Sequence, residues 1–352
     1  MTIDNEDMAK ISVGLDIGFS SVKVVVLSKK DNQFRLVSLG AIPAPSPGML
    51  SDSDIELEQV AVAIKKLMEA ARIEEREVVA ALPESRVFTR VIDDLPYLSD
   101  SELSSAIRFA SEEFIPMPSS EVNLYWQMLS RADEKDKKGR TVVFVVASPK
   151  NVIQKYIKVL NMAGLTPRVL ETEVIAAARS LVGNNPFSPN TLIIQMGATT
   201  TDLVAISKGL ILLTRSISTG GLALTRSLSK NFNFELLQAE EYKKVYGLVE
   251  DQLEGKVFAA LKPVVDVILE EIKRVIQSYE VKHPQNRLKR VVLSGGGAKM
   301  PGLVIYLAHS LGLEVQEADP WYLIQKDKSL VSKLSQEAPL YSVAVGLALR
   351  EE

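Results

Sequence analysis

Residues 13–27 read VGLDIGFSSVKVVVL, and residues 192–206 read LIIQMGATTTDLVAI. Each stretch is an apolar strand, then a tight turn with a central glycine and small hydroxyl residues, then a second apolar strand. A third strand is expected after each copy, at residues 34–39 and 210–216. A pattern that occurs once in each half of the chain predicts two related lobes. We expect these lobes to close on one phosphate-bearing ligand.

Length and composition describe a globular protein of two lobes. The chain has 352 residues, more than one hydrophobic core usually fills, so two lobes of roughly 150 residues each are expected. Hydrophobic residues make up 46% and charged residues 24%, which is ordinary for a globular protein. The net charge of −3 argues against electrostatic binding to nucleic acid or to anionic lipid.

The residue types that are absent or rare exclude several kinds of site. Without cysteine, disulfides, thiolate metal sites and cysteine nucleophiles are ruled out. His283 and His309 are the only histidines, which argues against a metal site built from several of them. No run of about 18 apolar residues is present, so we expect no membrane span. The polar, acidic start of the chain does not resemble a secretory signal, and a cytoplasmic location is expected.

The elements expected along the chain divide it into a lead, two lobes and an insertion. Residues 1–10 are expected to be a disordered lead. Lobe one is expected to span residues 11–185 together with 338–352, because the closing helix has no partners of its own. Within lobe one, residues of about 84–166 are expected to form an inserted β-α-β-β-α subdomain. Lobe two is expected to span residues 186–337, and the fold class is therefore α/β.

Local signals support this division. Ser99, with Glu102 three residues later, is typical of a capping box and predicts the start of the first helix of the insertion. Residues 131–140, at the tip of a hairpin in the insertion, are so charged that we expect them to be mobile. Residues 184–190, rich in Gly, Pro and Asn, are expected to form the hinge into lobe two. A helix is expected over residues 300–311.

The first hairpin offers groups suited to a phosphate and a metal ion. Gly18 lets the backbone approach a phosphate closely, and Ser20 and Ser21 offer hydroxyl and amide donors. Lys23, on the outgoing strand, can neutralise the charge of a β- or γ-phosphate. Asp16 lies where a Mg²⁺ ion held through waters needs a carboxylate. Taken alone, these residues also fit a β-hairpin in which Asp16 and Gly18 only shape the turn.

Four segments of the second half supply the other candidate contacts. A second phosphate hairpin, a helix N-terminus that favours an anion, and a glycine run that allows close approach to adenine or ribose are all expected. Their alternatives are ordinary strand residues, a flexible turn and a solvated ion pair. The candidates are Gly197, Ala198, Thr199 and Thr200 in the hairpin, Gly220 and Gly221 before a helix, Gly295, Gly296 and Gly297 between a strand and a helix, and Glu240 and Lys243 on one helical face.

A carboxylate at a strand end is the candidate for catalysis. Glu171 and Glu173 follow the strand at residues 169–170, where a carboxylate can position a water near a γ-phosphate. We assign this role to Glu171. A solvated strand end is an equally good interpretation of the same residues.

Together, the two hairpins, the strand-GGG-helix and an Ala-rich linking helix resemble the actin-like ATPase superfamily over residues 13–350. Within it, the chain resembles the PilM family of type IV pilus assembly proteins. The insertion after Pro83 lies where the PilM and FtsA families carry an extra subdomain. Residues 239–247 resemble the ribose and adenine contact helix that these families share. The stretches similar to the PilM family are residues 14–23 (GLDIGFSSVK), 95–96 (LP), 114–118 (FIPMP), 163–167 (AGLTP) and 346–350 (GLALR).

The resemblance implies an actin-like two-lobe fold, with a duplicated RNase H-like meander in the lobes, that binds ATP and Mg²⁺. Asp16 and Gln195 are then expected to hold the metal through waters. Gln195 stands where the superfamily usually has Asp, and Glu171 where Asp is more common. An amide adds no charge for the metal, so hydrolysis is expected to be slow or absent while nucleotide binding is kept.

The resemblance also implies a partner. In the PilM family this is the cytoplasmic N-terminal peptide of a PilN-like inner-membrane protein, expected here in the groove between the lobe-one core and residues 84–166. Other pilus platform proteins or self-assembly are further options. The protein is then peripheral at the inner face of the membrane. An FtsA-like division protein that forms filaments, and an actin-superfamily kinase or other ATPase, are the alternatives; the chain ends directly after its last expected helix, without the FtsA membrane helix.

Overall fold

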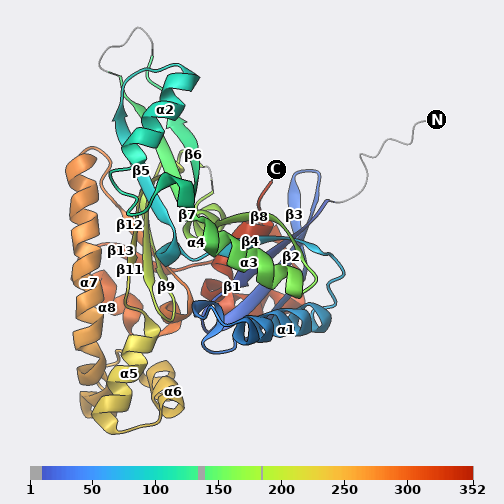
Figure 1. Ribbon diagram of the computed structural model, residues 1–352. Helices are drawn as coiled ribbons and strands as arrows, with labels where there is room; N and C mark the ends of the chain where they lie inside the picture. The colour runs from blue at the N-terminus through green and yellow to red at the C-terminus, as the bar shows by residue number, and fades with distance from the viewer. Residues whose placement is uncertain (1–9, 134–138, 184, 352) are drawn as a thin grey trace.

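The computed structural model of the chain describes residues 10–133, 139–183 and 185–351 (Figure 1). Within them the chain is a mixed α/β protein with three sheets. The six-stranded sheet has the order β14-β3-β2-β1-β4-β8, the five-stranded sheet β11-β10-β9-β12-β13, and the three-stranded sheet β5-β7-β6. Most of the predicted lead, the middle of the predicted mobile tip and Asn184 of the predicted hinge lie outside the described residues.

The strands are β1 (Lys10–Ile17), β2 (Ser21–Lys30), β3 (Gln33–Pro43), β4 (Glu77–Leu82), β5 (Phe88–Leu95), β6 (Val122–Ser130), β7 (Thr141–Pro149), β8 (Thr166–Thr172), β9 (Thr191–Met196), β10 (Thr201–Ser207), β11 (Leu210–Ile217), β12 (Arg290–Ser294), β13 (Glu314–Glu317) and β14 (Ile324–Gln325). The α-helices are α1 (Asp54–Ala70), α2 (Asp100–Ser111), α3 (Lys150–Met162), α4 (Glu173–Leu181), α5 (Gly221–Phe232), α6 (Leu236–Tyr246), α7 (Lys256–Lys282), α8 (Leu303–Leu311), α9 (Val331–Glu337) and α10 (Ser342–Ala348). None of the helices in these described residues is long and apolar enough to cross a bilayer.

The two predicted hairpins have the same backbone geometry. Each larger sheet contains an antiparallel meander, β1-β2-β3 in one and β9-β10-β11 in the other. The N–H of Gly18 donates to the carbonyl of Ser21 at 3.1 Å, and the N–H of Gly197 donates to that of Thr200 at 2.9 Å. The repeat seen in the sequence is therefore a repeat in structure, and the predicted two-lobe α/β fold is confirmed.

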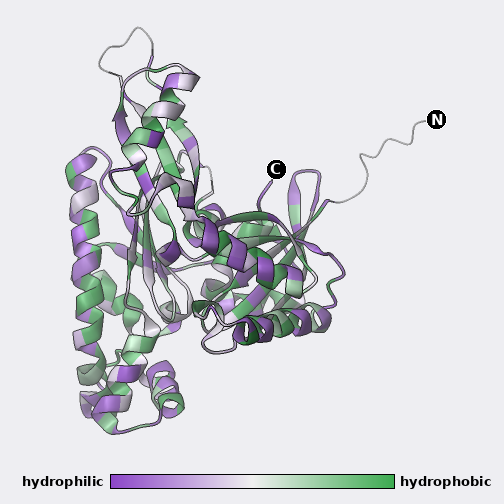
Figure 2. Cartoon of the chain, viewed as in Figure 1, coloured by the Kyte–Doolittle hydropathy of each residue, from purple (hydrophilic) through white to green (hydrophobic). Residues whose placement is uncertain are grey.

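The central strands are mostly apolar because both faces of each sheet are covered. Every residue of β10 is buried, as are the six residues from Val22 to Leu27 in β2. Strands buried on both faces consist of continuous hydrophobic runs rather than alternating ones. Figure 2 shows these strands as largely hydrophobic, while α1 and α7 carry both hydrophobic and hydrophilic residues. The helices thus close the cores with one face and meet solvent with the other.

Two short helices cross at the centre of lobe one. α10 packs on β1, β2 and β4 and crosses α4. At this crossing Gly346 lies so close to α4 that a Cβ on it would stand 1.8 Å from the carbonyl oxygen of Ala176. A Cβ on Gly14 of β1 would stand 2.2 Å from the carbonyl oxygen of Ala344. Glycine is required at both positions because the backbones themselves are in contact.

The insertion has the predicted order of elements, but its last helix belongs to the core of lobe one. α2 packs on the three-stranded sheet, where Leu103 and Ile107 lie with Val143 and Val145. α3 instead buries its apolar face against the strands and helix α1 of lobe one. Its amphipathic pattern is compatible with a helix in the insertion or in lobe one, so only the packing in the structure shows to which of the two α3 belongs. In Figure 1 the three-stranded sheet and α2 extend above both lobes.

Two local predictions can be compared directly. The capping box is confirmed, since the Glu102 carboxylate accepts from the N–H of Ser99 at 2.9 Å. The helix predicted at residue 300 begins only at Leu303, because Gly302 has φ +78° and a residue in the left-handed region cannot continue an α-helix.

Candidate functional site

The first hairpin carries a buried ion pair. Asp16 and Lys23 are cross-strand partners on β1 and β2, and the ammonium lies 2.8 Å from Asp16 Oδ2. Both side chains are buried. An ammonium has three donors, so Lys23 keeps others for a phosphate oxygen. Ser20 lies exposed at the turn, where its carbonyl accepts from the N–H of Ala44.

The second hairpin repeats this arrangement with different chemistry. Gln195 and Asp202 occupy the equivalent cross-strand positions on β9 and β10, so Asp202 stands where lobe one has Lys23. Gln195 Oε1 and Asp202 Oδ1 are buried and accept no hydrogen bond, while Thr200 donates to Asp202 Oδ2 at 3.2 Å. Burial raises the pKa of Asp202 to about 6, against the effect of the hydrogen bond from Thr200. Asp202 was not among the predicted site residues, although its position seven residues after Gln195 matches that of Lys23 after Asp16.

These oxygens fit a metal ion held through waters. Buried acceptors without partners favour a donor, and the waters around Mg²⁺ are donors to such oxygens. Within the described residues no three His, Asp or Glu side chains are grouped to bind a metal directly. The residues present therefore suit a hydrated Mg²⁺ that takes its direct ligands from a bound phosphate, with Asp16, Gln195 and Asp202 around its waters.

Two of the predicted glycine segments pack against the second hairpin. The N–H groups of Gly221 and Leu222, at the start of α5, donate to the carbonyls of Gly197 and Ala198 at 2.9 and 2.8 Å. These two N–H groups are therefore not free for an anion, so the N–H of Gly221 cannot serve the predicted anion site in this arrangement. Gly220 is needed for packing, because a Cβ there would lie 2.7 Å from the carbonyl oxygen of Gly197.

The Gly295–Gly297 turn lies beside the same hairpin. A Cβ on Gly295 would stand 2.5 Å from the carbonyl oxygen of Met196, and one on Gly297 would stand 2.4 Å from the Met196 side chain. Gly295 also has φ +79°, which favours glycine. Only Gly296 has ordinary space around its Cβ position, 3.5 Å from Leu340. The close approach that the three glycines allow is thus, for two of them, an approach to β9.

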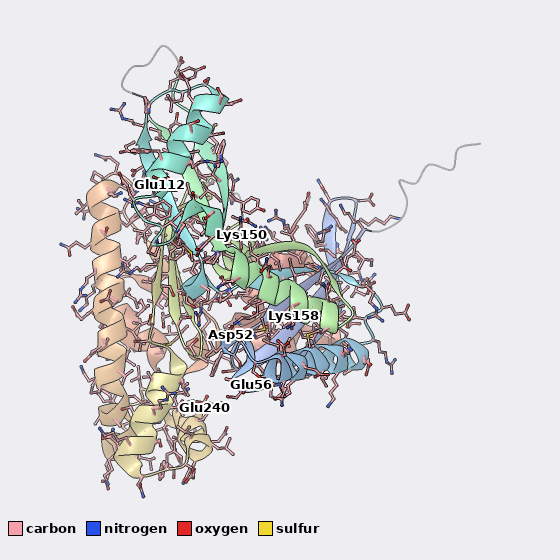
Figure 3. The ribbon with its side chains drawn as sticks, in the orientation of Figure 1. Asp52, Glu56, Glu112, Lys150, Lys158 and Glu240 are labelled. Carbon is pink, nitrogen blue, oxygen red and sulfur yellow. The ribbon has the colours of Figure 1, made fainter. Side chains whose placement is uncertain are left out.

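The Glu240–Lys243 pair forms a closed network between α5 and α6. The Lys243 ammonium donates to Glu240 Oε2 at 2.6 Å, to Thr225 Oγ1 at 2.9 Å and to the carbonyl of Gly221 at 3.0 Å. All three of its donors are therefore used inside the protein. Figure 3 shows Glu240 at the end of lobe two that is far from Glu112 and Lys150. A nucleoside contact from Lys243 requires this network to open.

Glu171 does not fit the predicted catalytic role. Its two oxygens accept from Arg179 at 2.5 and 2.8 Å, and Arg350 also donates to one of them. Arg179 in turn donates to the carbonyl of Gly346 at 2.6 Å. Three of the roughly four acceptor positions of this carboxylate are used by arginines. These contacts tie α4 and the end of the chain to β8, and they favour a structural role for Glu171.

Glu173 is the carboxyl that interacts electrostatically with the charged residues of both hairpins. It is the first residue of α4, directly after β8 ends. Burial raises its pKa well above the ordinary value, and the charges of Asp16, Asp202 and Glu84 raise it further, while Lys23 acts in the opposite direction. The chain turns between β8 and α4, and this turn sends residues 171 and 173 to different surroundings.

Glu84 is a second buried carboxyl at this junction. It lies in the turn after β4, where Oε1 accepts from Thr89 at 2.6 Å and Oε2 accepts no hydrogen bond. Burial raises its pKa from 4.5 to about 8, with the hydrogen bond from Thr89 opposing the shift and the charge of Asp202 adding to it. The group is therefore largely neutral at pH 7.

Glu84→Gln is expected to make stability less dependent on pH. A carboxyl whose pKa is raised on folding contributes its full stability below the unfolded value of 4.5, and that stability is lost as pH rises toward about 8. Between about pH 5 and about pH 8 the unchanged protein should lose on the order of a few kcal/mol of unfolding free energy relative to the variant. Urea unfolding at both pH values measures this. Parallel pH profiles would contradict a neutral, buried Glu84.

A separate pocket of about 310 Å³ lies in the insertion, between the end of α2 and the first half of β6. β6 is the outer strand of the three-stranded sheet. The pocket lies near the junction with lobe one, where Lys150 at the start of α3 donates to the carbonyl of Ser120 at 2.7 Å (Figure 3). Its apolar wall is formed by Ile115, Met117, Val122, Leu124 and Tyr125, and its polar wall by Arg108, Ser111, Glu112, Ser119 and Asn123.

Several known proteins are similar to this chain. A chain in a solved structure described as the PilM-PilN type IV pilus biogenesis complex is 30% identical, with a TM-score of 0.84 over 96% of this chain and 98% of that one. An MreB protein of Spiroplasma citri bound to AMPPNP is 15% identical, with a TM-score of 0.53 over 96% and 94%, and shows the shared actin-like fold. The cell division protein FtsA of Streptococcus pneumoniae serotype 2 is 23% identical over 341 residues, 86% of this chain and 74% of FtsA.

A sequence profile of one family agrees with the first of these similarities. The family is described as type IV pilus assembly protein PilM, and its profile matches residues 14–352, which include both hairpins and the insertion. The chain therefore belongs to the PilM family of type IV pilus assembly proteins.

Proposed function

We propose that this protein is an ATP-binding adaptor of a type IV pilus assembly platform that holds the cytoplasmic N-terminal peptide of a PilN-type membrane protein. The observation that carries the proposal is the 30% identity, over 96% of the chain, to a chain of a PilM-PilN complex. The proposal places the protein at the inner face of the membrane through this partner. The lobes are proposed as residues 11–185 with 338–352 and as residues 186–337, with the insertion at about 84–166.

The nucleotide site is proposed between the two hairpins. Lys23 supplies the cation for the phosphates, and Asp16, Gln195 and Asp202 surround the waters of Mg²⁺. Gly18, Ser20 and Ser21 of the first turn and residues 197–200 of the second supply close backbone approach and donors. An MreB protein with the same fold binds AMPPNP, which supports a nucleotide at this place.

The site favours binding over turnover. When bound, Mg²⁺ supplies charge that stabilises the phosphates. Phosphoryl transfer also needs a group that orients a water. Glu173 is the proposed group. Burial and the neighbouring carboxylates raise its pKa, which favours the uncharged carboxyl in the nucleotide-free protein and so lowers the fraction that can accept a proton. Gln195 adds no charge in the place where Asp16 has one, so hydrolysis is proposed to be slow.

Lys23→Ala is expected to weaken ATP by roughly 1.5–3 kcal/mol, the range for a charge-assisted hydrogen bond. Isothermal titration calorimetry with Mg-ATP measures the loss. Lys29→Ala is the matched control, because Lys29 lies on the same strand but pairs with the exposed Glu351. Equal affinity in the two variants would remove Lys23 from the site.

The peptide site is proposed at the pocket of the insertion. An extended peptide can place an apolar side chain against Ile115, Met117 and Leu124. Its backbone can pair with the outer edge of β6, the usual way in which a strand is added to a sheet. The polar wall formed by Arg108 and Glu112 then sets the register of the peptide. The pocket lies within the insertion, whereas the groove expected from the sequence lies between the insertion and the core of lobe one.

Tyr125→Ala is expected to weaken a PilN-type peptide by about ten-fold, the usual effect of removing an aromatic contact residue. Tyr125 lines the pocket and is 64% exposed, so its loss should not unfold the protein. Phe109→Ala is the matched control, because Phe109 is 74% exposed on α2 and does not line the pocket. Fluorescence anisotropy with a labelled peptide measures both. Equal losses would place the peptide elsewhere.

A further inference from the structure

Among the described residues, the insertion contacts lobe two through a hydrogen bond between two hydroxyl groups and through an ion pair of Asp93 with Lys282 at 3.7 Å. Thr89 of β5 and Thr214 of β11 lie with their hydroxyl oxygens 2.7 Å apart. The hydroxyl of Thr89 also lies 2.6 Å from Glu84 Oε1. The hydroxyls thus form a hydrogen-bond chain from lobe two through the insertion to the buried carboxyl of Glu84. Hydrogen bonds in such a chain polarise and strengthen one another.

At its insertion end, the hydrogen-bond chain is connected to the peptide pocket through neighbouring strands. In the three-stranded sheet Thr89 pairs with Val146 of β7, and Val146 pairs with Tyr125 of β6. A line across the sheet therefore joins the contact with lobe two to a residue of the pocket wall. Because the ladder holds strand spacing within narrow limits, a shift of β5 changes the position of β6.

At its lobe-two end, the hydrogen-bond chain is connected to the second hairpin through strand β11. On β11, Thr214 lies two residues from Ser216, so both side chains are on the same face of the strand. Ser216 is the cross-strand partner of Asp202 in the five-stranded sheet. Asp202 is thus connected to the contact between Thr214 and Thr89 through its cross-strand partner Ser216, which lies beside Thr214 on β11.

We propose that the Thr214–Thr89–Glu84 chain couples the nucleotide site to the peptide site, so that Mg-ATP tightens peptide binding and the peptide tightens ATP. The inference rests on the proposed function. Mg-ATP between the lobes holds lobe two against the insertion, and this favours the geometry of β5, β7 and β6 seen here. Coupling between two sites is reciprocal in free energy, so one factor describes both directions.

The test is a binding cycle with two ligands, AMPPNP with Mg²⁺ and a synthetic peptide of the cytoplasmic N-terminus of the PilN-type partner. In the unchanged protein, saturating nucleotide should tighten the peptide about five-fold or more, the lower end of typical allosteric coupling. Thr214→Ala should reduce this factor to below about two-fold, while each ligand alone keeps its affinity. Thr214→Ser restores the hydroxyl and should restore the coupling.

Thr166→Ala is the matched control, because Thr166 is an exposed strand residue of lobe one and takes no part in the Thr214–Thr89–Glu84 hydrogen-bond chain. Thermal unfolding of each variant shows that it is folded under the conditions of the titration. Equal coupling in the unchanged protein and in Thr214→Ala would overturn the inference, as would independent binding of both ligands to the unchanged protein. Failure of either ligand to bind the unchanged protein would instead refute the proposed function, and with it the coupling.

Discussion

Replacing Gly346 by alanine is expected to lower the free energy of unfolding by about 3 kcal/mol or more. Glycine-to-alanine changes inside a helix normally stabilise it by about 1 kcal/mol, so the expected sign is opposite to helix propensity. The reason is the crossing of α10 and α4, where the new Cβ would lie 1.8 Å from the carbonyl oxygen of Ala176 and 2.4 Å from its carbonyl carbon. Both atoms belong to the backbone, so one helix has to move away.

Urea unfolding followed by circular dichroism measures this effect. A shift of α10 also separates it from β1 and β4, which it covers, so the transition should become less cooperative as well as earlier. Gly296→Ala is the control, because a Cβ there meets only the Leu340 side chain at 3.5 Å and the backbone is not left-handed. The control should remain within about 0.5 kcal/mol of the unchanged protein. A Gly346→Ala variant as stable as the control would show that the helices separate without cost.

The repeat of the two hairpins could be predicted because it depends on local sequence. An apolar strand, a turn with glycine and a second apolar strand produce the same bond from Gly18 to Ser21 and from Gly197 to Thr200 without help from distant residues. The place of Lys23 followed from the same pattern. Local sequence signals were therefore enough to predict the two-lobe fold and the part of the proposed site that the first hairpin supplies.

Roles that depend on distant partners could not be predicted in this way. Glu171 and Glu173 are two residues apart and have the same chemistry, and nothing local shows that the arginines reach Glu171. Arg179 comes from the next helix, and Arg350 is 179 residues away. The same holds for α3, whose apolar face suits either the insertion or lobe one. The N–H of Gly221 was expected to be free for an anion because its acceptor, the carbonyl of Gly197, lies on a distant hairpin.

Asp202 is a different case, because its signal was present in the sequence. Aligning the two hairpins position by position places Asp202 opposite Lys23 and Gln195 opposite Asp16. The pair in lobe one is oppositely charged and satisfied, while the pair in lobe two leaves Gln195 Oε1 and Asp202 Oδ1 without hydrogen bonds. The negative charge missing at Gln195 is thus present one strand away. Only the structure shows that these acceptors are buried and unpaired.

Glu171→Gln is expected to lower the free energy of unfolding by about 3 kcal/mol, the lower end of the cost of breaking a buried ion pair. The lower end applies because only the carboxylate is fully buried. The Glu171 side chain is 4% exposed, whereas those of Arg179 and Arg350 are 24% and 34% exposed and can turn partly to water. Glutamine keeps the shape and one acceptor, but it leaves both guanidinium groups without a negative partner.

Two measurements on Glu171→Gln separate a structural role from a catalytic one. If Glu171 ties β8 to α4 and to the end of the chain, urea unfolding shifts, while Mg-ATP affinity well below the unfolding temperature is unchanged. If it instead positions a water, stability stays within about 0.5 kcal/mol and only turnover changes. Glu77→Gln is the control for loss of one charge in the same sheet, because Glu77 is an exposed glutamate at the start of β4.

The effect of Glu171→Gln should depend on Gly346. Because Arg179 also donates to the carbonyl of Gly346, loss of the carboxylate frees the arginine that holds α10 at its closest contact with α4. The destabilisation should therefore be non-additive with that of Gly346→Ala, since both changes release the same helix. Additive losses would show that the ion pair and the helix crossing stabilise separate parts of lobe one.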